Sequence, residues 1–268
     1  MSFARQFDQS AGRQRTQSRG RQFNDSLYLN LFGGNSGVPG KFGEGFSFSA
    51  VSDFGAIGGT PGPDFGKRSF TVRAWFNPSS TVGFLDFQYF CFLYNPITFA
   101  NGFSLFLNLE VVEIAGIQHQ FRVYQWSHSS GGVASDSFFD AGETEPVFPT
   151  PGQWHRVVLW YDAAALELGM QVDDRPPVTA ATGGATERMQ FNMGGTGFGP
   201  RGFAGSFDDI GIWHNYVWTE ADRLADWNAG AGVTWPDILR RDKVIAYFTF
   251  EPPEGQFVAP VFKCASRI

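Results

Sequence analysis

Residues 205–230, GSFDDIGIWHNYVWTEADRLADWNAG, combine the two structural signals that define this chain. In residues 205–213, side chains alternate with the period of two that is typical of a β-strand. The adjacent carboxylates Asp208 and Asp209 are therefore predicted to point to opposite faces of a sheet. One predicted face contains Phe207, Asp209, Gly211 and Trp213, and the other contains Asp208, Ile210 and Ile212.

The second half of this stretch, residues 219–230, carries the signals of a short helix. Thr219 and Asp222 have the spacing of a capping box, in which each side chain bonds the backbone N–H of the other residue. Leu224 and Trp227 lie three residues apart, so they share one side of the helix. The Asn-Ala-Gly sequence that follows is typical of a helix end. We therefore expect one short helix directly after a strand.

The chain after residue 26 reads as short strands separated by turns rich in Gly and Pro. Its 30 Phe, 8 Trp, 33 Gly and 15 Pro favour aromatic strands joined by turns over helices. We expect an all-β fold, a two-sheet antiparallel jelly-roll sandwich with one short helix and an extended N-terminal arm. The predicted strands are residues 27–32, 45–50, 69–77, 83–94, 102–114, 120–126, 153–162, 166–174, 189–195, 205–213 and 244–251.

The N-terminal residues 1–26 differ in composition from the rest of the chain. They are rich in Gln, Arg, Ser and Gly and lack apolar periodicity, which is typical of an arm that does not fold alone. Residues 1–23 carry five Arg and one Asp, a charge of +4, so the total of -6 leaves -10 on the remaining chain. We predict a basic arm, residues 1–26, and one domain, residues 27–268. The arginines of the arm are Arg5, Arg13, Arg15, Arg19 and Arg21.

Targeting signals are missing from the sequence. It has no run of about 20 apolar residues that could span a bilayer. Its first residues lack the apolar core of a secretory signal, so we expect a protein that is made in the cytoplasm. Cys91 and Cys264 both lie in apolar runs, and two cysteines make no disulfide framework. We interpret them as buried thiols and leave a disulfide between them open.

Four blocks of sequence follow one another in the order of a known family pattern. They are KFGEGFSFS (41–49), SFTVRAWFNP (69–78), GQWHRVVLWYDAAALELGMQVDD (152–174) and FAGSFDDIGIWHNYVWTEADRLADWNAGAG (203–232). On these blocks the chain resembles the laminin-G-like domains of the concanavalin A-like lectin/glucanase jelly rolls. It has Asp-Asp at 173–174, where that family usually has Asp-Gly. The resemblance implies a jelly roll, with sugar or protein recognition in many members and Ca²⁺ in some.

Catalysis by paired carboxylates is disfavoured by the spacing of the acidic residues. Retaining glycosidases need two carboxylates about 5 to 5.5 Å apart, which on a strand requires an even spacing. Asp208 and Asp209 are adjacent and fail this test, and the even-spaced pair at 143–145 lies in a loop-like stretch. Nucleophile, zinc and phosphate-loop signatures are also missing. We therefore expect that the chain is not an enzyme.

Calcium is the one cofactor that the sequence leaves open. Ca²⁺ accepts carboxylates and loop carbonyls that follow no fixed spacing. The first candidates are Asp208 and Asp209 on the predicted strand, and Asp140 and Glu143 in an acidic loop. The alternative interpretation of that loop is a solvated acidic surface. No other cofactor is expected.

A glycan platform is predicted where aromatic and polar residues meet at strand ends. Trp126 lies two residues from His128, and His214, Asn215 and Tyr216 follow one another. Sugars dock on exposed aromatic faces that have polar neighbours. The alternative is that these rings pack in the core, as most aromatic residues do.

Arm and domain together suggest the function. We expect a non-catalytic structural or adhesion protein of a large multi-copy assembly, a bacteriophage virion component for capsid decoration or in the tail. The basic arm would contact an acidic neighbouring subunit, and nucleic acid and membrane are not expected partners. The outer face would contact host glycans. The alternatives are a free carbohydrate-binding lectin and a glycan-degrading enzyme on the same fold.

Overall fold

A computed structural model describes the sandwich and not the arm. The described residues are 28–32, 35–48, 54–58, 68–79, 87–94, 103–114, 117–128, 133–137, 152–183, 190–193, 203, 205–235 and 237–250. Side chains are described throughout these ranges except in 28–32, 35–36, 54–58, 87–94, 103–114, 117–128, 133–137 and 190–193. The five arginines of the predicted arm, and both cysteine side chains, lie outside them. The division into arm and domain stays a prediction.

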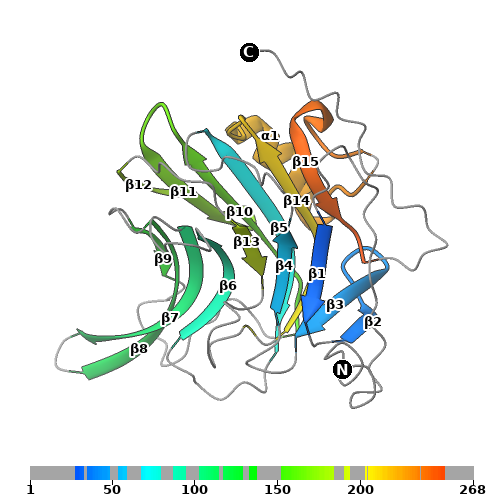
Figure 1. Cartoon of the computed structure of the whole chain (residues 1–268). Coiled ribbons are helices and arrows are strands. Elements are labelled where there is room, and N and C mark those ends of the chain that lie inside the picture. The colour runs from blue at the N-terminus through cyan, green and yellow to red at the C-terminus, as the bar shows by residue number, and fades with distance from the viewer. Residues whose placement is uncertain are drawn as a thin grey trace, which may run out of the picture.

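The described strands form two antiparallel sheets (Figure 1). The seven-stranded sheet has the order β1 (Tyr28–Phe32), β4 (Phe54–Gly58), β13 (Gln190–Met193), β6 (Phe87–Tyr94), β7 (Phe103–Ile114), β8 (Ile117–His128) and β9 (Val133–Ser137). The eight-stranded sheet has the order β12 (Val178–Ala181), β11 (Glu167–Val172), β10 (His155–Asp162), β5 (Phe70–Pro78), β14 (Gly205–His214), β3 (Glu44–Phe48) and β2 (Asn35–Pro39), and β15 (Val244–Phe248) also pairs with β14. The predicted all-β sandwich is confirmed.

Every strand predicted from the sequence coincides with a strand of the structure. The four strands that the sequence did not predict are β2, β4, β9 and β12, each of four or five residues. Gly and Pro in β2, and two Gly in β4, made those segments read as loops. Short strands of this kind are defined by the neighbour to which they bond rather than by their own composition.

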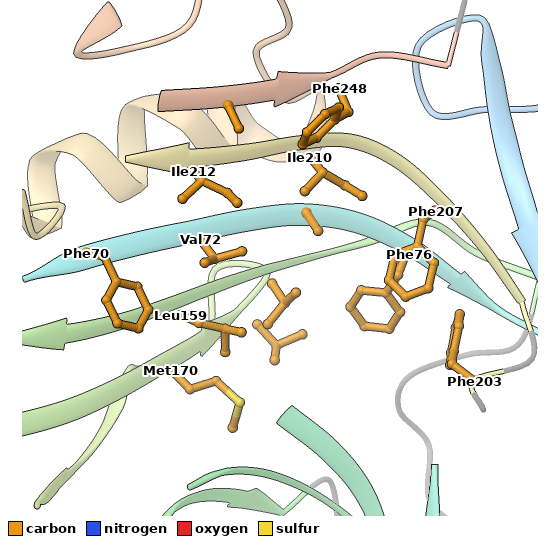
Figure 2. Packing of buried hydrophobic residues seen from close by; sticks show 14 of the residues in the cluster. Phe70, Val72, Phe76, Leu159, Met170, Phe203, Phe207, Ile210, Ile212 and Phe248 are labelled. Carbon is orange, nitrogen blue, oxygen red and sulfur yellow. The ribbon is translucent and has the colours of Figure 1, made fainter. Parts of the chain in front are cut away.

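The inner face of the eight-stranded sheet forms the core of the sandwich. Its side chains come from alternate positions of each strand, such as Phe70, Val72 and Phe76 of β5 and Leu159 of β10. Figure 2 shows these side chains on one side of the sheet, together with Met170 of β11. Complete burial of each such side chain contributes about 1.5–3 kcal/mol, so the packing of this face stabilises the sandwich.

A bulge in β14 overturns the predicted alternation of its side chains. The register with β5 shifts between Asp208 and Gly211, and Asp209 has a left-handed backbone with φ of 52°. The extra residue places Phe207 and Ile210 on the same inner face, where the prediction had put them on opposite faces. Asp208 and Asp209 therefore both lie on the outer side. The side chains of adjacent residues point to opposite faces of a sheet only where the hydrogen-bond ladder is regular.

Residues 216–235 and 237–243 pack on the outer face of the same sheet, against β10, β5 and β14. This outer layer contains α1 (Glu220–Trp227), whose predicted capping box is present: Thr219 and Asp222 bond each other's backbone N–H. Asn228 ends the helix with a left-handed backbone, φ 48°. An apolar cluster joins layer and sheet. Its buried members are Val158, Trp160, Trp213, Trp218, Ile238 and Val244.

Helix α1 buries charged residues and exposes an apolar one. Asp222, Arg223 and Asp226 are its buried residues. Leu224, by contrast, is 54% exposed, although it lies three positions from the partly buried Trp227. The sheet below therefore has to supply charged partners for this helix, because a buried charge without a partner is costly.

Candidate functional site

The predicted glycan platform comes from two different sheets. Trp126 and His128 belong to β8 in the seven-stranded sheet, and their side chains lie outside the described ones. His214 ends β14 in the eight-stranded sheet, and Asn215 and Tyr216 follow it. A platform that includes Trp126 and His128 stays a prediction. The described geometry concerns the end of β14.

Backbone contacts hold the end of β14 in place. Asn215 is exposed and has a left-handed backbone with φ of 56°, and its N–H donates to the carbonyl of Ser69 at 2.7 Å. The Thr71 hydroxyl donates to the Tyr216 carbonyl and accepts from the Trp218 N–H, both at 3.1 Å. The half-buried His214 pairs in register with Phe70. These residues therefore sit on the sheet and not on a loose loop.

Tyr216 is tied to the start of helix α1. Its hydroxyl donates to Asp222 Oδ2 at 2.7 Å, and Arg240 Nε donates to Asp222 Oδ1 at 3.2 Å. The Arg240 guanidinium carbon lies 5.3 Å from the centre of the Tyr216 ring. Burial and the bond to Asp222 raise the pKa of Tyr216 above its usual value. Tyr216 therefore acts as a neutral donor and as a support for an arginine.

The capping carboxylate has a shifted pKa of its own. Burial acts to raise the pKa of Asp222, but hydrogen bonds from Tyr216 and Thr219 and the charge of Arg240 outweigh it. The pKa of Asp222 is consequently lower than usual. This carboxylate is ionised at neutral pH and holds Tyr216, Thr219 and Arg240 together.

A second arginine–aromatic pair lies in the same outer layer. The Arg241 guanidinium carbon is 4.4 Å from the centre of the Trp235 ring, which contacts the Tyr247 ring at 5.8 Å. Tyr216 and Trp235 both pack against the apolar cluster of the outer layer. We call Tyr216, Trp235, Arg240 and Arg241 the arginine ledge.

Of the arginine ledge, only Tyr216 was predicted from the sequence. The run Arg-Arg-Asp-Lys at residues 240–243 is a further signal, because it is unusually basic for a chain with a net charge of -6. Pairing of that run with aromatic residues up to 24 positions away could not be derived from local spacing.

The predicted calcium candidates on β14 are engaged by donors of the protein. Asp208 is 1% exposed, and its Oδ2 accepts from the backbone N–H of Phe42 at 2.8 Å. Asp209 is fully buried, and its two oxygens accept from Arg73 at 2.7 Å and from the Thr234 hydroxyl at 3.0 Å. In the part of the chain that the structure describes, no group of three or more potential metal ligands occurs. Asp140 and Glu143 lie outside the described residues, so a calcium site that includes them stays a prediction.

Asp209 belongs to a buried charge network beneath α1. The side chain of Arg73 bonds Asp209 and lies 3.3 Å from Asp226, whose other oxygen accepts from Arg156 at 3.2 Å. Burial works against the charge of Arg73, but Asp226, Tyr247 and Asp209 together raise its pKa. Burial lowers the pKa of Arg156, which Asp226 only partly offsets. The network is the charged partner that the buried face of α1 requires.

His155 is a buried, hydrogen-bonded residue at the start of β10. Its Nδ1 lies 2.8 Å from Asp173 Oδ2, and the ring contacts Phe76 of the core. The other oxygen of Asp173 accepts from the Arg156 backbone N–H at 2.7 Å. Asp173 has a left-handed backbone with φ of 52° and lies in the turn at residues 173–174. This pair therefore fixes a turn.

Comparisons with known proteins give no family for this chain. No protein-family model matches the chain, and no curated protein matches it. The chain is similar to a SAP-like pentraxin of Limulus polyphemus at 12% identity, with 86% of this chain and 88% of that chain covered and a TM-score of 0.44. Mouse laminin α1 LG4-5 matches at 16% identity, with 55% and 36% covered and a TM-score of 0.33. Trypanosoma rangeli sialidase matches at 12% identity, with 79% and 32% covered and a TM-score of 0.45.

The chain spans about a third of the length of the laminin and sialidase chains. Its strands form a β-sandwich of two antiparallel sheets. The two-sheet antiparallel fold that the four sequence blocks imply is thus confirmed. Among the described residues, no helix is long and apolar enough to cross a membrane.

Proposed function

We propose that this chain is a non-catalytic recognition module that presents the arginine ledge to a glycan. The main support for the proposal is a contrast in exposure between the polar residues of β14 and those that follow it. The carboxylates of Asp208 and Asp209 are buried and bonded to protein donors, whereas Asn215 and the guanidinium group of Arg240 remain open to solvent. The buried part supports the outer layer, and the open part offers donors to a ligand.

The test of glycan recognition is a glycan array with the full chain, with and without added Ca²⁺. We expect binding that is lost in an Arg240→Gln, Arg241→Gln double variant. A wild-type chain that binds no glycan on the array would remove the recognition module from consideration. Binding that requires Ca²⁺ would favour the predicted calcium site at Asp140 and Glu143.

The finer proposal is that the module belongs to a bacteriophage virion, in capsid decoration or in the tail, and that residues 1–26 tether it there. Support comes from the opposite charges of the two parts, +4 on residues 1–23 and -10 on the remaining chain. Such a contrast allows the arm of one copy to bind the acidic domain of another or a similar acidic subunit.

Deletion of residues 1–26 tests the tether. We expect a folded domain, by circular dichroism, that no longer assembles in size-exclusion chromatography or incorporates into particles. Unchanged assembly of the truncated chain would contradict the proposed role of residues 1–26 as a tether. The alternative of a free carbohydrate-binding lectin would then remain. That alternative keeps the arginine ledge and differs only in the arm.

Glycan degradation is the disfavoured alternative on this fold. The described carboxylates on β14 are structural, and the acidic loop at 143–145 lies outside the described residues. A polysaccharide-degradation screen with the wild-type chain and with a Glu143→Ala, Glu145→Ala variant addresses it directly. Degradation by the wild type that this variant loses would overturn the non-catalytic proposal.

A further inference from the structure

Within the described part of the chain, one cation of residues 240–243 has no carboxylate partner. Arg240 bonds Asp222 at 3.2 Å, and the Lys243 ammonium lies 3.6 Å from Asp242. Arg241 is exposed and has no ion pair with any carboxylate among the described residues. Its guanidinium group therefore offers unused donors at the surface of an acidic protein.

The Arg241 side chain is oriented before any ligand arrives. Its guanidinium group lies over the Trp235 ring, and stacking of this kind restricts the rotation of a long side chain. The loop that carries it is fixed by the buried Ile238 and by a bond of 2.9 Å from Trp213 Nε1 to the Leu239 carbonyl. An ordered arginine loses less conformational entropy on binding than a mobile one.

A strained backbone at Arg240 directs the two neighbouring arginine side chains to different aromatic rings. Arg240 has φ of 51°, in the left-handed region that residues with a Cβ rarely adopt. The turn begins the 3₁₀ segment Arg241–Lys243, which the Lys243 N–H closes on the Arg240 carbonyl at 2.9 Å. Because of this turn, Arg240 reaches back to Tyr216 while Arg241 lies on Trp235.

We propose that the arginine ledge binds a glycan that bears an oxyanion, a carboxylate or a sulfate group, through the planar donors of Arg241. The inference rests on the proposed function and names its ligand class. A guanidinium group pairs with such an oxyanion by two parallel hydrogen bonds. The exposed Asn215, beside Tyr216, supplies neutral donors and acceptors for sugar hydroxyls. Because Asp222 and Asp242 neutralise the flanking cations, the ledge suits a single anionic sugar and not a dense polyanion.

The test uses the full chain and three trisaccharides of equal length in isothermal titration calorimetry. Trigalacturonic acid carries carboxylates, sulfated maltotriose carries sulfates, and maltotriose is neutral. We expect at least one anionic trisaccharide to bind at least tenfold more tightly than maltotriose, and we expect this preference to weaken as salt is added. The two anionic arms distinguish a carboxylate from a sulfate ligand.

Two substitutions of Arg241 distinguish the contribution of its charge from that of its planar guanidinium group. Arg241→Gln should weaken anionic binding at least tenfold, and Arg241→Lys should restore only part of it, because lysine keeps the charge but lacks the planar fork. The matched control is Arg175→Gln, in the turn after β11, which should bind like the wild type. Circular dichroism confirms that each variant is folded.

Three outcomes would overturn the inference. They are equal binding of maltotriose and the anionic sugars, unchanged binding by Arg241→Gln, and the absence of any anionic binding by the wild type. If maltotriose binds equally to wild type and Arg241→Gln, glycan recognition survives and only the ligand class fails. If none of the three binds, the inference fails. The glycan array then tests glycan recognition, and the arm deletion tests the tether, independently of it.

Discussion

Arg73 of β5 and Asp226 of α1 lie 3.3 Å apart, and neither side chain is exposed to solvent. The pair joins the sheet to the helix, and Arg156 approaches the other oxygen of the same carboxylate. Burial of charge is costly, so the two arginines depend on Asp226 once the outer layer is in place. The stability of the whole outer layer should therefore be sensitive to this single carboxylate.

Replacement of the shared carboxylate tests that dependence. We expect Asp226→Asn to lower the free energy of unfolding by about 3–5 kcal/mol, because it leaves two buried guanidinium groups under-compensated. Urea denaturation followed by tryptophan fluorescence measures the change. The control is Asp237→Asn, at an exposed position of the same layer, which should change stability by less than about 0.5 kcal/mol. Similar stabilities for the two variants would contradict the network as described.

The capping carboxylate should make the stability of the fold depend on acid pH. The pKa of Asp222 is lowered in the folded state, so its contribution is present above the unfolded pKa of about 3.9 and is lost as pH falls through the folded pKa. We therefore expect the stability difference between wild type and Asp222→Asn to be constant from pH 7 to about 5 and to shrink below about pH 4. Urea midpoints measured across this range check the sign. A difference that grows on acidification would show that the pKa shift has the opposite direction.

The N-cap itself can be tested without a change of charge. Thr219→Ala removes the hydroxyl that accepts from the Asp222 N–H at 3.1 Å and should cost about 1 kcal/mol. Thr219→Ser keeps the hydroxyl and should stay close to the wild type. Thermal denaturation of the two variants gives the comparison, and equal melting temperatures would rule out a stabilising cap.

A glycine of β11 should resist substitution because of one tryptophan. A Cβ placed on Gly169 would run into the indole ring of Trp160, its register partner on β10. We expect Gly169→Ala to cost about 1–3 kcal/mol, as overpacking of a core does. In a Trp160→Leu background the same change should cost clearly less, which a double-mutant cycle by urea denaturation measures. An equal loss of stability in both backgrounds would mean that the Trp160 indole is not the reason why residue 169 must be glycine.

The capping box shows what local sequence can predict. Thr219 and Asp222 are three residues apart, and their interaction needs only the first turn of a helix, so it was predictable and is present. The strand positions were predictable for the same reason, since period-two alternation reflects a sheet with one face in the core. The faces of β14 were not, because the bulge arises in the pairing with β5 and leaves no alternation signal of its own.

The residues of the candidate site show the limit of such reasoning. Tyr216 could be found because it stands beside other polar and aromatic residues. Arg240, which lies over its ring, is 24 positions away and meets it only because residues 216–243 fold back across the outer face of the sheet. The same folding decides that Leu224 is exposed while Asp226 is buried, against their hydropathy.

By itself the sequence determined an all-β sandwich, the strands of its core and a capped helix after β14, because these depend on periodicity and on contacts within a few residues. Only the folded chain shows that both aspartates of β14 lie on the outer side of the sheet, that Asp226 lies between two arginines, and that no carboxylate of the described residues pairs with Arg241. Those relationships join residues far apart in the chain, and their energies depend on burial, which a linear sequence does not specify.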